Sequence, residues 1–443
     1  MKVAIVGSGI AGLGCAHALA RDATRQRQPL ALSLYEAAPR LGGHTNTVDI
    51  TVDGREFAVD TGFLVFNERT YPNLIRLFEE LEVPVAKSDM SFAVSTKIEG
   101  RFGHRLLEWS GTNLDSVFAQ RRNLLSPRFG SMLRDILRFN REATALARAA
   151  IPNAQTLGEY LDAHRYGEPF RRWYLLPMAG AIWSCPLTTM LAYPVATFVR
   201  FCDNHGLLQV NRRPQWFTVE GGARQYVRKI AAGLDHAGHE VRIGDPVRRV
   251  RRVAGQVEVE SRRGLAHYDH VVFACHSDQA RALLTDADPH EAQLLDDVGY
   301  QPNRAVLHTD TALLPQSRKV WAAWNYLSDS TRDASDDGAP AVSVSYLLNK
   351  LQPLPVTTPV VVTLNPLRAP RAETVLAEFD YEHPVFTQAA IAAQRRLANL
   401  QGRRQVWFAG AWTGYGFHED GLKSGLAVAG ALLAQQRQQR LAA

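Results

Sequence analysis

The stretch that decides the fold is Lys2–Gly12, with the sequence KVAIVGSGIAG. Its four consecutive apolar residues, VAIV, predict a short buried strand, and three glycines follow at the spacing GxGxxG. In this pattern Gly7 permits a tight turn, Gly9 lets the backbone approach a pyrophosphate, and Gly12 lets the next helix pack closely on the strand. The stretch therefore predicts the opening of a Rossmann-like, dinucleotide-binding fold.

The residues after the glycines continue this pattern. Ala11–Arg21 predicts a helix of small residues, and Leu30–Tyr35 predicts a second strand that leads into Glu36. A pyrophosphate would sit at the helix N-terminus, where free N–H groups and the helix dipole favour anions. An acidic side chain at the position of Glu36 can hold ribose hydroxyls, which favours an unphosphorylated ribose over NADP.

Further along the chain the pattern changes twice. From about residue 71 to 201 helical spacing dominates and predicts a helical insertion or second domain. The strands expected at Val247–Val253 and Gln256–Glu260 resume the sheet. Short β-rich runs in residues 303–364 predict an antiparallel sheet for a substrate domain.

The last segment restores strand, glycine turn and helix. Residues 406–409 predict a strand and Leu422–Leu433 a helix, with Asp420 at the expected N-cap. The polar end, Gln435–Ala443, is expected to fray.

A second glycine motif narrows the class of dinucleotide. The sequence RLGGH follows the second strand and resembles that of the large flavoprotein group containing amine oxidases, phytoene desaturases and protoporphyrinogen oxidases. In that group a glutamate, a basic residue and a Gly-Gly pair approach the FAD phosphates and ribityl chain. Glu36, Arg40, Gly42 and Gly43 match this pattern, while His44 stands where arginine is usual.

The resemblance extends over nearly the whole chain. It continues at FAVDTG (57–62), DPV (245–247), WFAG (407–410) and GLKSG (421–425). It implies noncovalent FAD, because no cysteine follows Cys275 to form the covalent link seen in some relatives.

The resemblance also implies the domain plan. We expect an α/β fold in which a Rossmann-like FAD-binding domain is joined to a second, α+β substrate domain. The FAD-binding domain is expected at residues 1–68, 205–290 and 395–443, and the substrate domain at residues 69–204 and 291–394. The residues expected to contact FAD are Gly7, Ser8, Gly9, Ile10, Ala11, Gly12, Glu36, Arg40, Gly42, Gly43, His44, Thr61, Gly62, Val247, Gly410, Gly421 and Leu422.

Two departures from the family pattern bear on the reaction. Ala411 stands where many members have an acid that holds the ribityl chain. Amine oxidases commonly place a lysine near flavin N5, whereas Asn303 or Arg304 is expected in that neighbourhood here. Arginine cannot act as a tunable base, which argues against amine oxidation. Aromatic residues could instead build an apolar pocket: Trp173, Tyr174, Trp183, Tyr193, Phe198, Trp321, Trp324, Tyr326 and Tyr346.

Three functional hypotheses follow. Residues 304–309 and 324–326 resemble a bacterial FAD-binding subgroup often encoded beside cyclopropane fatty acid synthase-like enzymes. This favours a dehydrogenase or desaturase of a lipid or acyl chain, with hydride transfer to flavin N5. The alternatives are a polyamine or amino-acid oxidase, and a non-redox flavoprotein or FAD-binding partner of a lipid-modifying enzyme. No catalytic residue is assigned, and His418 is the first candidate, ahead of His308 and Glu419.

Composition sets the remaining expectations. A net charge of +6 on 443 residues, without an RNA-binding or helix-turn-helix signature, predicts no nucleic-acid partner. Four separated cysteines predict neither a metal site nor disulfides and fit a cytoplasmic protein. The partner is expected to be a small-molecule or lipid substrate, with peripheral membrane contact left open. The electron acceptor and the oligomeric state are also left open.

Overall fold

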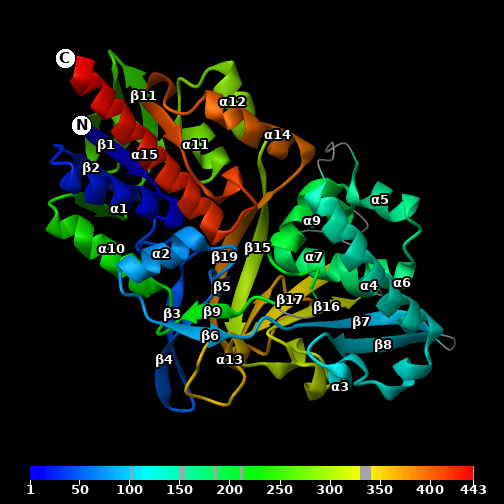
Figure 1. Ribbon diagram of the computed structural model, residues 1–443. Helices are drawn as coiled ribbons and strands as arrows, with labels where there is room; N and C mark the ends of the chain where they lie inside the picture. The colour runs from blue at the N-terminus through cyan, green and yellow to red at the C-terminus, as the bar shows by residue number, and fades with distance from the viewer. Residues whose placement is uncertain (101–102, 150–154, 184–186, 210–212, 330–340, 443) are drawn as a thin grey trace.

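The computed structural model describes residues 1–100, 103–149, 155–183, 187–209, 213–329 and 341–442. A parallel sheet with its helices occupies one end of the molecule, and a larger mixed sheet with a helical layer occupies the other (Figure 1). The predicted α/β fold with a Rossmann-like domain and a second α+β domain is confirmed. The exact domain boundaries stay a prediction.

The parallel sheet has five strands in the order β10-β2-β1-β14-β20. Every neighbouring pair in it is parallel, so all five carboxyl ends lie at one edge. The strands are β1 (Lys2–Val6), β2 (Ala31–Glu36), β10 (Glu240–Ile243), β14 (His270–Phe273) and β20 (Val406–Phe408).

One face of this sheet is covered by α1 (Ile10–Arg25), α10 (Arg224–His236) and α15 (His418–Ala442). The first and last helices approach closely because glycines of each lie against the other helix, Gly14 against Leu422 and Gly425 against Ala11. A Cβ atom on Gly425 would lie 2.2 Å from the carbonyl oxygen of Ala11. Larger residues here would push the two helices apart.

The opposite face packs against α11 (Ser277–Leu283), α12 (Pro289–Asp296), α14 (Gln388–Arg396) and a small antiparallel sheet. That sheet consists of β11 (Val247–Val253), β12 (Gln256–Ser261) and β13 (Gly264–Tyr268). Its first two strands lie where the sequence predicts them.

Helix α15 corrects two expectations. It begins at His418 and runs through Ala442, so residues 435–442 are helical and not frayed. Alanine, glutamine and arginine are good helix formers, which explains the extension. Asp420 is not the N-cap but lies inside the first turn, where its carboxylate accepts the backbone N–H of Phe417 at 3.0 Å.

The larger sheet has the order β19-β15-β18-β17-β16-β7-β8. It contains the antiparallel strands expected in residues 303–364. The strands are β7 (Phe92–Gly100), β8 (Gly103–Ser110), β15 (Gly299–His308), β16 (Trp324–Asp329), β17 (Ala341–Leu347), β18 (Val361–Leu364) and β19 (Val375–Val385). Strands β15 and β19 run from the Rossmann half into the substrate half (Figure 1).

Residues 71–201 are not uniformly helical, which corrects the prediction. β6 (Val85–Ser88), β7 and β8 interrupt the helices, and β6 pairs with β9 (Trp216–Val219). The alternation of FAVSTKIEG in β7 is a period-two signal that the helical reading missed. The helices of this region are α2 (Pro72–Glu80), α3 (Leu114–Val117), α4 (Pro127–Arg148), α5 (Leu157–Ala163), α6 (Glu168–Phe170), α7 (Leu176–Trp183), α8 (Leu187–Leu191) and α9 (Val195–Asn204).

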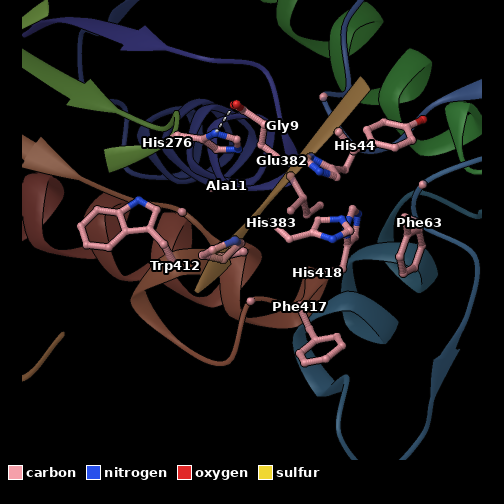
Figure 2. A pocket seen from close by; sticks show the side chains of 18 of the residues that line it. Gly9, Ala11, His44, Phe63, His276, Glu382, His383, Trp412, Phe417 and His418 are labelled. Carbon is pink, nitrogen blue, oxygen red and sulfur yellow. Dashed lines mark ion pairs between the residues drawn. The ribbon is translucent and has the colours of Figure 1, made fainter. Parts of the chain in front are cut away.

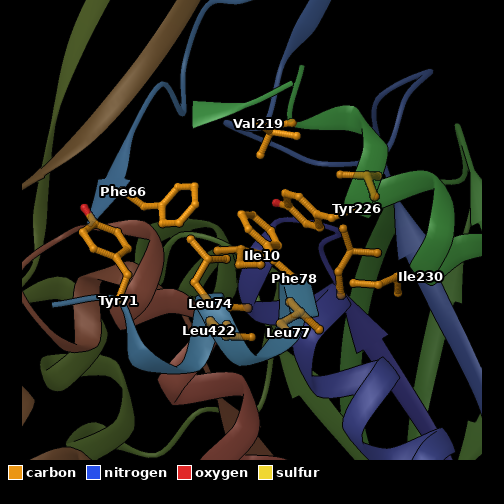
Figure 3. Close-up of a cluster of buried hydrophobic side chains, with 14 of the residues drawn as sticks. Ile10, Phe66, Tyr71, Leu74, Leu77, Phe78, Val219, Tyr226, Ile230 and Leu422 are labelled. Atoms are coloured by element: carbon orange, nitrogen blue, oxygen red, sulfur yellow. The ribbon is translucent and has the colours of Figure 1, made fainter. Parts of the chain in front are cut away.

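Helix α2 joins this region to the Rossmann half. Leu74, Leu77 and Phe78 are buried beside Tyr226 of α10 and Leu422 of α15 (Figure 3). The carboxylate of Glu419 accepts the backbone N–H groups of Asn73 and Leu74 at the start of α2, each at 3.0 Å. Glu419 therefore serves as a helix cap, and its carboxylate is committed to that role.

Candidate functional site

The carboxyl edge of the parallel sheet opens into one cavity of about 740 Å³. Each of the five strands ends at, or a few residues before, a residue that lines it, and the cavity continues onto the larger sheet and the helical layer. These strand-end residues are Gly7, Glu36, Val247, Cys275 and Gly410.

The glycine turn is shaped for a close ligand. A Cβ atom on Gly12 would lie 2.0 Å from the carbonyl oxygen of Gly7, so the packing of α1 against this turn requires glycine at position 12. A Cβ atom on Gly9 would meet no other residue within 4 Å, so its open side faces free space. Gly9 is also the N-cap of α1 and provides no side-chain cap, which leaves the helix N-terminus available to an anion.

Glu36 ties the end of β2 to this turn. Its carboxylate accepts the backbone N–H of Ser8 at 3.0 Å and also the Ser8 hydroxyl. Its other oxygen accepts the backbone N–H of Ala38 at 2.8 Å. The acid is thereby held at the cavity wall, where ribose hydroxyls could reach it.

Most of the residues expected to contact the cofactor line this one cavity. They are Gly7, Ser8, Gly9, Ile10, Ala11, Glu36, Gly42, Gly43, His44, Thr61, Gly62, Val247 and Gly410. The catalytic candidate His418 also lines it.

Four of the residues expected to contact the cofactor do not line the cavity. Gly12 packs against the glycine turn, and Arg40 donates to the carbonyl oxygen of Gly43 at 2.9 Å. Gly421 abuts Ile10, and Leu422 is fully buried in the hydrophobic core. Because α15 begins at His418, four residues before the expected start at Leu422, its open N-terminal turn is at His418 rather than at Gly421.

Histidines gather in the middle of the cavity (Figure 2). The ring of His44 lies 5.4 Å from that of His383 and 6.2 Å from that of His276, measured between centroids. Burial lowers the pKa of His44 to about 3 and that of His383 to about 4. These imidazoles are therefore neutral at pH 7 and can accept or donate hydrogen bonds without adding charge.

His418 is the most firmly held of the group. Its ring stacks on Phe63 with 3.8 Å between centroids, and its Nε2 lies 2.8 Å from the hydroxyl of Tyr226. Thr45 Oγ1 is 3.3 Å from the same nitrogen. Burial lowers the pKa of His418 to about 3. The imidazole is thus neutral and fixed in orientation.

His383 is a site residue that the sequence reading missed. It lies on β19, two residues after Tyr381, so both side chains share one face of the strand. Its Nδ1 is 3.3 Å from the amide nitrogen of Asn303 on the neighbouring strand. The alternation of Phe379, Tyr381 and His383 is the one signal that could have indicated a shared face.

Strand β15 does not provide the side chains expected there. Arg304 points to solvent and pairs with Glu378 at 2.7 Å. Asn303 is buried between strands and lies outside the cavity lining. His308 is bonded to Thr363 and to the backbone N–H of Asp310, so it is a structural residue.

The far end of the cavity is apolar. Among the aromatics proposed from the sequence, Trp183, Trp324 and Tyr346 line it, whereas Trp173, Tyr193, Phe198 and Tyr326 are buried in the core. The other lining residues of this end include Phe63, Leu64, Val65, Met90, Ile182, Phe201, Leu207, Trp216, Leu364, Phe386, Tyr415 and Phe417.

Charge is scarce along the cavity wall. Among the described lining residues the acids are Glu36 and Glu382, and no lysine or arginine is present. Glu382 Oε2 lies 3.5 Å from Nδ1 of His276, and burial lowers the pKa of that histidine. The indole N–H groups of Trp183 and Trp324 are buried without a hydrogen-bond partner in the described part of the chain. This end therefore offers apolar surface and, among its donors, two indole N–H groups that have no partner in the described residues.

A dinucleotide-binding sheet whose strand ends share a cavity with a second, mixed sheet is typical of two-domain enzymes that use a dinucleotide cofactor. The chain belongs to the flavin containing amine oxidoreductase family, whose sequence model matches residues 10–433. Its cofactor is FAD. The open side of Gly9 and the glycine-lined strand ends fit this cofactor's pyrophosphate.

Solved structures show the same fold at low sequence identity. Cyclohexylamine oxidase from Brevibacterium oxydans IH-35A matches with a TM-score of 0.67 and 17% identity, over 98% of this chain and 99% of that chain. A CLA-producing fatty acid isomerase from P. acnes gives 0.66 and 13%, over 97% and 98%. Putrescine oxidase bound to putrescine gives 0.65 and 16%, over 98% and 99%. No curated protein matches the sequence.

No helix of the described residues is long and apolar enough to cross a membrane.

Proposed function

We propose that this protein is an FAD-dependent dehydrogenase or desaturase of an apolar substrate, most simply a lipid acyl chain. The observation that carries the proposal is the far end of the cavity, which is lined by aromatic and aliphatic side chains. Among the described lining residues there is no lysine or arginine, and the acids are Glu36, at the cofactor end, and Glu382. A long hydrocarbon gains free energy by leaving water for such a wall.

We assign FAD to the strand ends of the same cavity. Gly7, Ser8, Gly9 and the start of α1 would hold the pyrophosphate, and Glu36 the ribose. Gly42, Gly43 and His44 would approach the phosphates and ribityl chain. FAD bound there supplies the acceptor for a hydride from a substrate C–H bond.

The side chains at the far end would position the substrate and exclude water. The aromatic walls hold an acyl chain, and the indole N–H groups of Trp183 and Trp324 can donate to an ester oxygen. In a desaturation the neighbouring carbon must also lose a proton. His418, held by Tyr226, is our first candidate to relay it, because an imidazole with a pKa of about 3 can pass a proton on but cannot keep it at pH 7.

Amine oxidation is the second candidate. Two of the structures that share the fold are named as amine oxidases, and Glu382 could attract a cationic amine. The side chain of Glu382 is 48% exposed, so water and salt screen its charge, which weakens this reading. The fatty acid isomerase of the same fold supports a third candidate, a reaction without net electron transfer.

The test is the visible spectrum of the FAD-loaded protein under anaerobic conditions. Phospholipids with cyclopropane or methyl-branched acyl chains are added in one series, and putrescine or cyclohexylamine in another. Bleaching of the flavin by lipid alone supports the proposal. Bleaching by amine alone overturns it in favour of an oxidase, and a rearranged lipid product without bleaching overturns it in favour of an isomerase.

We further propose a cytoplasmic location and no nucleic-acid partner. The free cysteines Cys15 and Cys202 are buried, and burial raises the pKa of Cys15 to about 12, so this thiol is inert.

A further inference from the structure

Leucines stand in solvent at the end of the molecule remote from the Rossmann sheet. Three of them lie in the connection between β8 and α4, where Leu114 is 77%, Leu124 59% and Leu125 89% exposed. Figure 1 shows β8, α3 and α4 at this end. Isolated exposed leucines are common, but three within twelve residues are unusual. Such a group of exposed apolar side chains is typical of a surface that binds another molecule.

The backbone holds these leucines outward. Leu124 and Leu125 end the short 3₁₀ helix η1 (Arg121–Leu125), which lies along the open edge of β8. Gln120 Nε2 and Arg122 Nη2 donate to the carbonyl oxygen of Leu106 on that edge, at 3.2 and 2.8 Å. The exposed pair is therefore presented by an anchored turn.

A positively charged hollow adjoins the leucines. Lys97, His104 and Arg105 line it, with Leu106 and Gln316, and it encloses about 420 Å³. Arg122 and Arg128 lie close enough to Arg105 to contribute to lowering its pKa, together with partial burial. The hollow and its two arginine neighbours thus concentrate positive charge beside exposed hydrocarbon.

Nearby acids are largely committed elsewhere. Glu108 is buried and accepts the backbone N–H groups of Gln316 and Ser317. Asp115 is bonded to Arg121 and lies 3.3 Å from Nζ of Lys319. Glu99, exposed opposite His104 in the strand register, is the remaining acid of the stretch 97–128. Among the described residues of 97–128, arginines therefore outnumber the acids that are not already bonded.

The basic surface continues along α4. Arg134 and Arg141 are exposed at helical spacing around Leu137, which is 61% exposed, while Phe129, Met132 and Phe139 face inward. A helix with arginines and a leucine on its outer face is suited to lie against a charged, partly apolar plane.

We propose that this surface, formed by the hollow, η1 and the outer face of α4, docks on a membrane that contains anionic phospholipid. Lipid phosphates would occupy the basic hollow, and Leu114, Leu124 and Leu125 would insert among the head groups. Nucleic acid offers the same negative charge but no place for the leucines, and a second copy of this chain would bring together two basic surfaces.

The inference goes beyond the proposed reaction and uses different residues. It also provides an approach for a lipid substrate, because α4 packs against α9, whose Phe201 lines the apolar end of the cavity. Binding to membranes can be measured without turnover, so its failure would leave the redox assignment standing.

The experiment is co-sedimentation of the FAD-loaded protein with vesicles of equal parts phosphatidylcholine and phosphatidylglycerol, compared with phosphatidylcholine alone. We expect binding to the anionic vesicles that weakens with added salt. The triple variant Arg105→Gln, Arg122→Gln, Arg128→Gln should bind on the order of 100-fold more weakly, because each basic residue near the surface contributes about a factor of five. Leu124→Ser with Leu125→Ser should weaken binding on the order of tenfold per leucine.

Matched controls carry the same chemical changes elsewhere. Arg76→Gln, Arg228→Gln and Arg248→Gln remove three exposed arginines, and Leu265→Ser removes a leucine that is 54% exposed on β13. Both control variants should bind like the parent, and all variants should retain the flavin spectrum. Equal loss in test and control variants, equal binding to neutral vesicles, or a concentration-dependent dimer that the leucine substitutions abolish would overturn the proposal.

Discussion

At the cofactor end of the cavity the lining residues come from short loops that follow five neighbouring strands, whereas at the substrate end they come from segments scattered over the chain. The first end is set by backbone requirements, such as the space at Gly9 and the close packing at Gly12. The second is set by which side chains happen to meet across β16–β19, α7 and α9. Substitutions should therefore act on cofactor binding at one end and on substrate handling at the other.

The largest expected effect separates two glycines of the same turn. In Gly12→Ala the new Cβ atom would lie 2.0 Å from the carbonyl oxygen of Gly7, so we expect a loss of about 3 kcal/mol of stability, and loss of FAD binding. Gly9→Ala meets no protein atom within 4 Å, so the apoprotein should lose about 1 kcal/mol or less. Its FAD affinity should nevertheless fall about 100-fold, because the methyl group enters the pyrophosphate space.

Urea unfolding of the apoproteins and FAD titration by fluorescence quenching measure these two quantities. If Gly9→Ala bound FAD normally, the assignment of this turn to the pyrophosphate would be wrong.

The second effect concerns the pH dependence of stability and belongs to the substrate end. Burial lowers the pKa of His205, which lines this end, to about 4, from the ordinary 6.5. Because the folded-state pKa is the lower one, the unfolded chain binds more protons between pH 6.5 and 4, and stability falls as pH drops through that window. At pH 4 this histidine lowers the free energy of unfolding by about 3 kcal/mol relative to pH 7.

Between pH 7 and pH 4 the free energy of unfolding of His205→Gln should therefore fall by about 3 kcal/mol less than that of the parent. Unfolding of the two apoproteins in urea at each pH measures this difference. Parallel stability profiles of the two proteins would show that this histidine is not buried in neutral form.

The third effect lies where the two ends meet. His418→Ala should lower lipid-dependent flavin reduction about 100-fold, the range for loss of one acid–base group, with FAD affinity unchanged. Tyr226→Phe removes the hydroxyl that lies 2.8 Å from Nε2 of His418 and should give about a tenfold loss. Stopped-flow reduction measures both, and an unchanged rate in His418→Ala would remove this residue from the mechanism.

The smallest effect tests a single donor at the substrate end. Trp324→Phe keeps most of the aromatic surface but removes an indole N–H that has no hydrogen-bond partner in the described residues. We expect KM for a phospholipid to rise about fivefold with kcat little changed. A fivefold change corresponds to about 1 kcal/mol, the contribution of one neutral hydrogen bond. A change in FAD affinity would instead break the division between the two ends.

Most of the residues predicted for the cofactor end line one cavity, because the rules that indicate them are local. Gly7, Gly9 and Glu36 stand at fixed distances from strands that the apolar pattern reveals. Gly421 and Leu422 do not line the cavity, because α15 begins at His418 and Asp420 accepts the backbone N–H of Phe417, which a search for an N-cap does not reveal.

The substrate end could not be predicted in the same way. His383 enters the site because β19 pairs with β15, which brings it beside Asn303, 80 residues away in sequence. Arg304 was expected at the cavity but points to solvent, since a one-residue step along a strand reverses the direction of the side chain. Strand pairing and register depend on tertiary packing rather than local spacing.

The close contact between α1 and α15 also has a consequence for how the protein is made. The first helix is synthesised about 400 residues before Gly425, which lies against it in the folded protein. Gly410 and His418 of the cavity wall emerge at the same late stage. The nascent chain thus carries an incomplete cofactor site until residues 410–425 have been made, and loading with FAD follows their synthesis.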